Sequence, residues 1–173
     1  MPAPILNIDS VEFRDWGHNS GGPGKTNPGE HYQAKLGEIG RRLGAQKLGY
    51  SLIVVPAGKT AFPFHNHRAN EEMFFILSGE GELRVGKERY PLRAGDVICC
   101  RTGGPETAHQ IANTSNAELK YLGVSTKIYP ELTDYPVSGK FGVFAEITDA
   151  DGKHRVFRHW DREGTTLDYW EGE

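Results

Sequence analysis

The stretch "FPFHNHRANEEMFFILSG", residues 62–79, combines two histidines, a pair of glutamates and an apolar run that ends at a glycine. Side chains alternate between the two faces of a β-strand, so His65 and His67 should project to the same side, about 7 Å apart. Asn66 would then point to the opposite face. This spacing predicts a strand whose two imidazoles are close enough to bind one cation.

Further candidate ligands follow these two histidines in the sequence. "RAN", residues 68–70, predicts a short turn, after which a strand that begins near Glu72 returns a carboxylate beside the imidazoles. His109 is the candidate for one more ligand, because it opens the strand "HQIAN" directly after the loop "RTGGPET". Imidazoles with a carboxylate are suitable ligands for iron, manganese, nickel, copper or zinc. We therefore expect one divalent metal ion at this site.

The middle of the chain is typical of an all-β protein. The chain's 22 glycines and 10 prolines among 173 residues, together with short apolar runs, favour many strands and tight turns over long helices. From residue 49 the runs recur at regular intervals, a pattern typical of an antiparallel sandwich or a closed barrel. Within it, "SGEGELRVGKERYPL" predicts two hairpins that share the strand Glu82–Val85, with turns near residues 78–81 and at 86–87.

The two ends of the chain are expected to pack on this barrel as parts of one structural domain. Residues 1–48 are rich in glycine and predict extra strands or ordered loops that lead into a barrel at residues 49–126. Residues 127–173 predict an extension that packs on the outside of the barrel or on a partner subunit. The aromatic residues that would otherwise be exposed there are Phe157, Trp160, Tyr169 and Trp170.

Composition excludes some classes of partner. The formal net charge is -3 and the basic residues are scattered among acids, so we expect neither nucleic acid nor an anionic membrane as a partner. No apolar run approaches the roughly 20 residues that cross a bilayer, and the N-terminus lacks a signal-peptide pattern, which predicts a cytoplasmic protein. Cys99 and Cys100 are adjacent and poorly placed to pair, so we expect reduced thiols, one of them in the core.

The same residues resemble the two sequence motifs of the cupin superfamily. The first motif is matched by Gly58, His65, His67, Glu72 and Gly79. The second motif is matched by Gly95, Asp96, His109 and Asn113. The chain departs from the family in the six residues between the first glycine and HxH, where five are common, and in a longer loop, "CCRTGGPETAH". The resemblance covers about residues 49–125.

This resemblance implies a small jelly-roll β-barrel with a divalent metal ion, Fe, Mn, Ni, Zn or Cu, at one end. The implied ligands are His65, His67, Glu72 and His109. Four such ligands leave coordination positions open for water or substrate. Glu71 is the weaker alternative to Glu72, because the motif spacing selects Glu72 and leaves Glu71 facing solvent.

The resemblance leaves the reaction open, because this fold hosts many functions. We expect a metal-dependent enzyme acting on a small oxygen-rich metabolite, as a sugar-phosphate-type isomerase or an iron dioxygenase. The alternative is a non-catalytic protein that binds a sugar or an organic acid through the metal. Glu106 in the mouth loop is the nearby spare base for proton transfer, and Asn113 is either a substrate ligand or a structural turn partner. The extra strands and the aromatic tail are surfaces that would make a homodimer.

Overall fold

The computed structural model describes residues 3–18, 28–164 and 166–172, and these residues are folded almost entirely as β-strands. The strands are β1 (Arg14–Gly17), β2 (Gln33–Glu38), β3 (Leu48–Val55), β4 (Asn66–His67), β5 (Glu72–Ser78), β6 (Glu80–Val85), β7 (Glu88–Arg93), β8 (Val97–Cys100), β9 (His109–Ala112), β10 (Leu119–Thr126), β11 (Glu131–Tyr135), β12 (Lys140–Thr148) and β13 (His154–Arg162). The helical segments among these residues are the short 3-10 turns η1 (Ile8–Ser10) and η2 (Pro105–Thr107).

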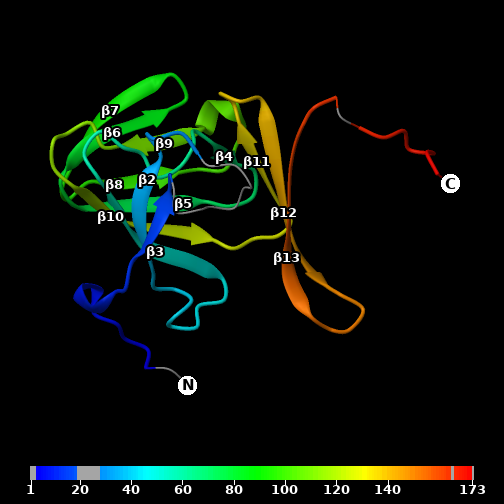
Figure 1. Ribbon diagram of the computed structural model, residues 1–173, viewed down its shortest axis with the longest axis horizontal. Coiled ribbons are helices and arrows are strands. Elements are labelled where there is room, and N and C mark those ends of the chain that lie inside the picture. The colour runs from blue at the N-terminus through cyan, green and yellow to red at the C-terminus, as the bar shows by residue number, and fades with distance from the viewer. Residues whose placement is uncertain (1–2, 19–27, 165, 173) are drawn as a thin grey trace.

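The strands pair antiparallel in three sheets within the described part of the chain. The largest sheet has the order β1-β2-β3-β10-β5-β8, and a second has the order β7-β6-β9. The third has the order β13-β12-β11-β4 and is called the C-terminal sheet below. Figure 1 shows its β12–β13 hairpin beside the body formed by the other two sheets. The arrangement confirms the predicted all-β, jelly-roll fold.

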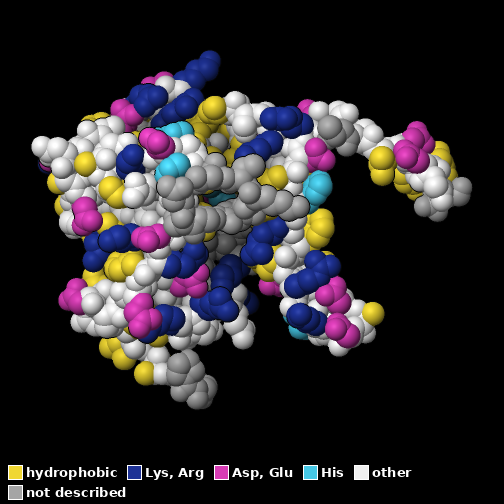
Figure 2. Space-filling model, in the orientation of Figure 1, with side chains coloured by type: hydrophobic (Ala, Val, Ile, Leu, Met, Phe, Trp, Pro, Cys, Tyr) yellow, Lys and Arg dark blue, Asp and Glu magenta, His cyan; other side chains and the backbone are white. Residues whose placement is uncertain are grey.

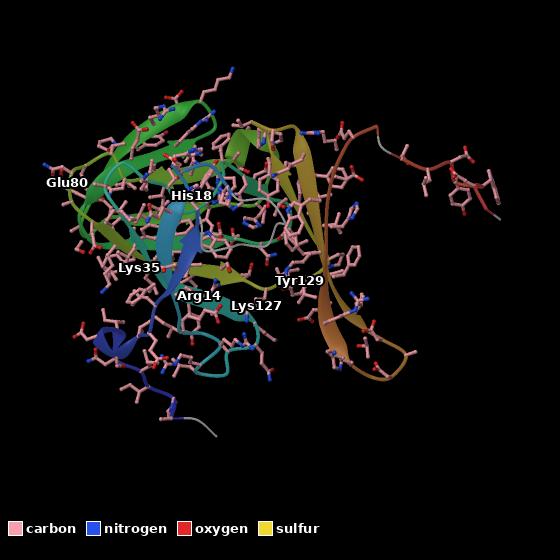
Figure 3. All side chains as sticks on the ribbon, in the orientation of Figure 1. Arg14, His18, Lys35, Glu80, Lys127 and Tyr129 are labelled. Atoms are coloured by element: carbon pink, nitrogen blue, oxygen red, sulfur yellow. The ribbon has the colours of Figure 1, made fainter. Side chains whose placement is uncertain are left out.

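The hydrophobic core lies between the six-stranded and the three-stranded sheets. Alternate side chains of β5 and β10 turn inward, and Ile76 and Tyr121 are almost completely buried there. The three-stranded sheet contributes Leu83 and Ile111 to the same cluster. Full burial of each large apolar side chain stabilises the fold by roughly 1.5–3 kcal/mol. Figure 3 shows how side chains fill the interior of this body, which therefore supplies rigid walls for a site.

The prediction of two hairpins sharing Glu82–Val85 is wrong for the first of them. The strands β5 and β6 do not pair, because β5 lies between β10 and β8 while β6 lies between β7 and β9. The chain crosses from one sheet to the other at Gly79, which has a φ of +86° and whose added Cβ would lie 2.3 Å from the Glu118 carbonyl oxygen. Only glycine fits this corner without strain. The second hairpin, β6–β7 with Gly86 in its turn, is confirmed.

Both ends of the chain add strands to the barrel. The N-terminal strands β1 and β2 extend the six-stranded sheet through β3, while residues 19–27 of the predicted N-terminal extension lie outside the described residues. At the other end, Lys127 and Tyr129 lie in the link between the body and the C-terminal sheet (Figure 3). Tyr169 and Trp170 are 83% and 72% exposed, so they do not pack on the barrel. The homodimer stays a prediction.

The structure places the charged residues and the two cysteines. Figure 2 shows lysines and arginines mixed with acidic residues over the visible face. In the described ranges, no helix is long and apolar enough to span a membrane. Cys100 is buried and Cys99 is exposed, which confirms that one of the two thiols lies in the core.

Candidate metal centre

The segment that carries the two histidines of the HxH pattern joins two sheets. On one side His65 pairs with His109 of β9, through backbone N–H···O distances of 3.2 and 2.8 Å. On the other side His67 lies opposite Thr133 of β11, in the C-terminal sheet. The His67 carbonyl also accepts a hydrogen bond from the Gly103 N–H at 2.9 Å. Because its backbone is bonded on both sides, this segment presents its side chains from a fixed position.

Three imidazoles converge on one carboxylate oxygen. The Nε2 atoms of His109, His67 and His65 lie 2.9, 3.5 and 4.0 Å from Oε2 of Glu72. The four side chains are between 4 and 18% exposed. One ligand atom each from His65, His67 and Glu72 can be chosen so that all lie within 4.8 Å of one another. The side chains that the sequence singled out as metal ligands are therefore brought together.

The cluster fits a divalent transition metal. Both ring nitrogens of His67 are buried without a hydrogen-bond partner within the described residues. Buried polar atoms are nearly always paired, and a metal ion between Nε2 of His67 and the Glu72 carboxylate would give this nitrogen a partner. Imidazole nitrogens with one carboxylate oxygen are a donor set that suits iron, manganese, nickel, copper and zinc alike.

In the metal-free cluster, the charge of the Glu72 carboxylate is balanced by a proton on a histidine. Burial opposes ionisation of Glu72, but the hydrogen bond from His109 and the nearby His67 outweigh it and hold the pKa of Glu72 well below its usual range. Burial also opposes protonation of His67, yet the carboxylates of Glu131 and Glu72 raise its pKa to about 9. For His65, burial dominates and lowers the pKa to about 4. At neutral pH, the metal-free cluster thus holds a proton on His67 in the place of a metal's charge.

A small cavity opens onto these side chains. It has a volume of about 190 Å³. Its lining residues are Phe62, His65, His67, Glu72, Phe74, His109, Gln110, Ile111 and Tyr121. Tyr121 is 1% exposed, and its hydroxyl has no hydrogen-bond partner among the described residues. Gln110 is anchored by donating from Nε2 to the Phe62 carbonyl at 2.8 Å. The cavity therefore combines apolar walls with a few polar groups.

The other predicted site residues lie away from this cavity. Glu106 turns back on its own loop, where Oε1 accepts a hydrogen bond from the Gly104 N–H at 2.9 Å. Hydrogen bonds from its own backbone N–H and from that of Gly104 lower the pKa of Glu106. Asn113 donates to the carbonyls of Val55 and Ala117 and accepts from Ser115, so its amide joins a turn to the end of β3. The proposed site accordingly uses neither residue.

The position of Glu71 supports the choice of Glu72 as the candidate metal ligand. The side chain of Glu71 is exposed, and its backbone N–H donates to Thr126 at 3.0 Å. Glu72, one residue later, turns its carboxylate into the cluster of imidazoles. This alternation is the one expected of a strand that begins at Glu72.

Two residues near the cluster were not predicted. Tyr121 could have been found, because strand alternation places it on the same inward face as Leu119. Glu131 lies in the C-terminal sheet with its side chain 4% exposed, and its Oε2 is 3.6 Å from Nδ1 of His67. No local pattern marks it, since it approaches the cluster only through the pairing of β11 with β4.

The centre of the chain is similar to a family of known proteins. The family described as "Cupin domain" matches residues 51–125. An uncharacterised protein of Methanocaldococcus jannaschii is 34% identical over 76 residues, which are 44% of this chain and 58% of that protein. An oxalate-binding protein of Thermotoga maritima is 35% identical over 75 residues, which are 43% of this chain and 59% of that protein. The chain thus spans less than two thirds of the length of these relatives.

Solved structures share the fold over more of the chain. The crystal structure of a cupin-superfamily sugar phosphate isomerase from Silicibacter pomeroyi has a TM-score of 0.74 at 24% identity and covers 96% of this chain and 98% of that one. A predicted oxalate decarboxylase from Thermotoga maritima has a TM-score of 0.56 at 21% identity and covers 72% of this chain and 99% of that one. At these identities the likeness concerns the fold, and in the first case it includes the terminal extensions.

Proposed function

We propose that this chain, which contains a cupin domain at residues 51–125, holds one divalent transition metal and uses it to take up a small oxygen-rich acid. The proposed ligands are His65, His67, Glu72 and His109. The observation that carries the proposal is the convergence of three Nε2 atoms on Oε2 of Glu72, together with the buried Nε2 of His67, which has no hydrogen-bond partner in the described part of the chain.

The walls of the cavity suit an acid held by a metal. A bound divalent metal supplies Lewis acidity, which polarises a carbonyl or carboxylate and stabilises the negative charge on it. Phe62, Phe74 and Ile111 limit the access of water, which strengthens electrostatic interactions inside the cavity. The Tyr121 hydroxyl makes no hydrogen bond within the described residues and is available to donate one to an oxygen of the acid.

The size and charge of the cavity favour a small acid over a sugar phosphate. A volume of about 190 Å³ is below the usual range for drug-sized ligands and has room for a few carbon atoms with their oxygens. None of the described residues that line it is a lysine or an arginine, the side chains that most often bind phosphate. The resemblance to an oxalate-binding protein over the cupin segment supports the same choice.

The lining also bears on the reaction. A proton transfer within the substrate needs a free base, and the one carboxylate among the described lining residues, Glu72, is a proposed metal ligand. Chemistry carried by the metal itself, as in an iron dioxygenase, needs no such base. Binding of a small acid and metal-centred chemistry on it are therefore both compatible with the lining, whereas sugar-phosphate isomerisation lacks a free carboxylate base among the described lining residues.

Calorimetry on metal-loaded protein tests this proposal, with oxalate as the probe and glucose 6-phosphate as the comparison. We expect oxalate to bind and the sugar phosphate to bind far more weakly. Tyr121→Phe should weaken oxalate binding about 5- to 10-fold, the value of one hydrogen bond, and should leave the metal content unchanged. Preferred binding of glucose 6-phosphate would contradict the proposed substrate class. Oxygen uptake with hydroxy and keto acids then separates an oxygenase from a binding protein.

A further inference from the structure

Glu131 is the most deeply buried carboxylate near the metal centre outside the cupin segment. It begins β11, beyond residue 125 where the family match ends, and its side chain is 4% exposed. An isolated carboxylate at such a depth is costly unless it is hydrogen-bonded or paired. The Glu131 carboxylate should therefore have hydrogen-bond donors or a cation beside it.

A loop wraps the Glu131 carboxylate in backbone N–H groups. Oε1 accepts hydrogen bonds from the N–H groups of Arg68 and Ala69 at 2.9 and 3.1 Å. Oε2 accepts one from the N–H of Asn70 at 2.8 Å and another from the Asn70 side chain. Successive N–H groups of this kind form a concave site for an anion. The carboxylate is thus fixed directly after the HxH segment.

The fixed carboxylate faces one of the proposed metal ligands. Oε2 of Glu131 lies 3.6 Å from Nδ1 of His67, a buried nitrogen with no hydrogen-bond partner among the described residues. The other ring nitrogen of His67, Nε2, faces Glu72 at 3.5 Å. A neutral imidazole carries its proton on one nitrogen and a lone pair on the other. An acceptor on the Nδ1 side therefore leaves the lone pair of Nε2 for the metal.

The other two histidines share this orientation through nearer acceptors. Nδ1 of His65 lies 2.7 Å from the Pro63 carbonyl oxygen. Nδ1 of His109 lies 3.4 Å from the Thr107 carbonyl oxygen. In each case the acceptor is the backbone two residues earlier, and Nε2 points toward Glu72. For His67 alone among the three, the oxygen that faces Nδ1 belongs to a side chain of the C-terminal sheet, Glu131.

We propose that Glu131 is a positioning residue for the metal centre, which holds the proton of His67 on Nδ1 and thereby presents Nε2 to the metal. Carboxylates that accept from a metal-binding histidine fix its tautomer and ring orientation, and their loss typically weakens metal binding 10- to 100-fold. The inference rests on the proposed metal function. It adds that the C-terminal sheet completes the centre of the cupin domain.

The strand that carries Glu131 offers a matched control. Asp134, also on β11, accepts hydrogen bonds at 2.8 Å from the Asn66 side chain and from the Arg68 guanidinium. It therefore ties the same segment to the same sheet, but among the described residues no hydrogen bond or ion pair joins it to a proposed metal ligand. Asp134→Asn tests a structural role of this surface, whereas Glu131→Gln tests the positioning of His67.

The experiment measures the dissociation constant of Co²⁺ for the full chain by competition with a chelator, with the visible absorption of Co²⁺ as a readout of its ligands. We expect Glu131→Gln to weaken Co²⁺ binding 10- to 100-fold and to change the absorption bands. Asp134→Asn should leave both unchanged within error. Unchanged binding in Glu131→Gln, or equal weakening in the two variants, would overturn the positioning role while leaving the metal function intact. A parent chain that binds no Co²⁺ would overturn the metal function and this inference together.

A second measurement applies if Glu131→Gln fails to fold. The unmodified protein, loaded with zinc and labelled with ¹⁵N, gives long-range ¹H–¹⁵N correlations of its histidine rings. We expect His67 to carry its proton on Nδ1 and the zinc on Nε2, with the Nδ1 proton protected from exchange. Zinc on Nδ1 of His67, or an Nδ1 proton in fast exchange with water, would overturn the inference.

Discussion

His67 and the other two histidines of the cluster are oriented from different parts of the molecule. For His65 and His109, Nδ1 faces the backbone carbonyl two residues earlier, at 2.7 and 3.4 Å. For His67, Nδ1 faces the carboxylate of Glu131 in the C-terminal sheet, at 3.6 Å. The first arrangement is local to the cupin segment, whereas the second depends on a strand that the family match does not include. A sequence motif can thus place the candidate ligands without including every group that orients them.

The largest change in stability is expected at the junction, when the hydrogen bonds that hold the HxH segment against the C-terminal sheet are removed. Asn66 is fully buried and donates from Nδ2 to the Gly103 carbonyl and to Asp134 Oδ2, both at 2.8 Å. Asn66→Ala leaves both acceptors without this donor, which we expect to lower the free energy of unfolding by roughly 2–4 kcal/mol. Thermal or denaturant unfolding of the metal-free protein measures this change.

A matched variant shows whether the effect belongs to the junction. Asn113→Ala also removes a buried amide with two donated hydrogen bonds, but it does so in a turn within the barrel. It should destabilise the protein by a similar amount and leave the metal affinity of the folded form unchanged. Asn66→Ala should lower both the stability and the metal affinity, because it removes both hydrogen bonds of this side chain, whereas Asp134→Asn keeps an oxygen that can accept from Asn66. Equal metal affinities in the two variants would show that the junction does not help to orient His67.

The pH dependence of metal binding should sharpen the contrast between His65 and His67. In the metal-free protein, burial lowers the pKa of His65 to about 4, while neighbouring carboxylates overcome burial and raise that of His67 to about 9. Near neutral pH a metal therefore displaces a proton from His67 but none from His65. We expect release of about one proton and a rise in affinity of roughly tenfold per pH unit from about pH 6.5 to 8.5.

The raised pKa of His67 also predicts how the stability of the metal-free protein changes with pH. The pKa of His67 is raised on folding, so its contribution to the stability of the metal-free protein is complete below about pH 6.5 and is lost as pH rises toward 9. Calorimetry in buffers of different protonation enthalpy counts the released protons, and unfolding at several pH values follows the stability. A metal affinity that is flat between pH 6.5 and 8.5 would contradict the assignment of the proton to His67.

The parts of the site that could be predicted from the sequence depend on short-range geometry. The clustering of His65, His67 and Glu72 follows from strand alternation and a turn of a few residues, both of which are local. The fold class follows in the same way from short apolar runs between glycines and prolines. The hairpin error at Gly79 marks the limit of this reasoning, because a tight turn between two runs does not reveal whether the strands pair or enter different sheets.

Glu131 could not be predicted, for a physical reason of the same kind. It reaches His67 because β11 pairs with β4 in a register that sets Thr133 opposite His67. That register is a long-range property, and nothing in the local sequence distinguishes Glu131 from Asp134, the other acidic residue of the same strand. Its burial distinguishes it from ordinary surface glutamates, and burial at this position is visible only in the folded chain.

Elemental analysis of the purified protein decides whether the cluster of His65, His67, Glu72 and His109 binds a metal. The protein is prepared without added metal and without a histidine tag, beside His65→Ala and His109→Ala variants. We predict near-stoichiometric iron, manganese, nickel, copper or zinc in the parent and its loss in both variants, because each variant removes one of the nitrogens that converge on Glu72. A parent chain that contains no metal, and that gains none when each ion is added back, would contradict the account.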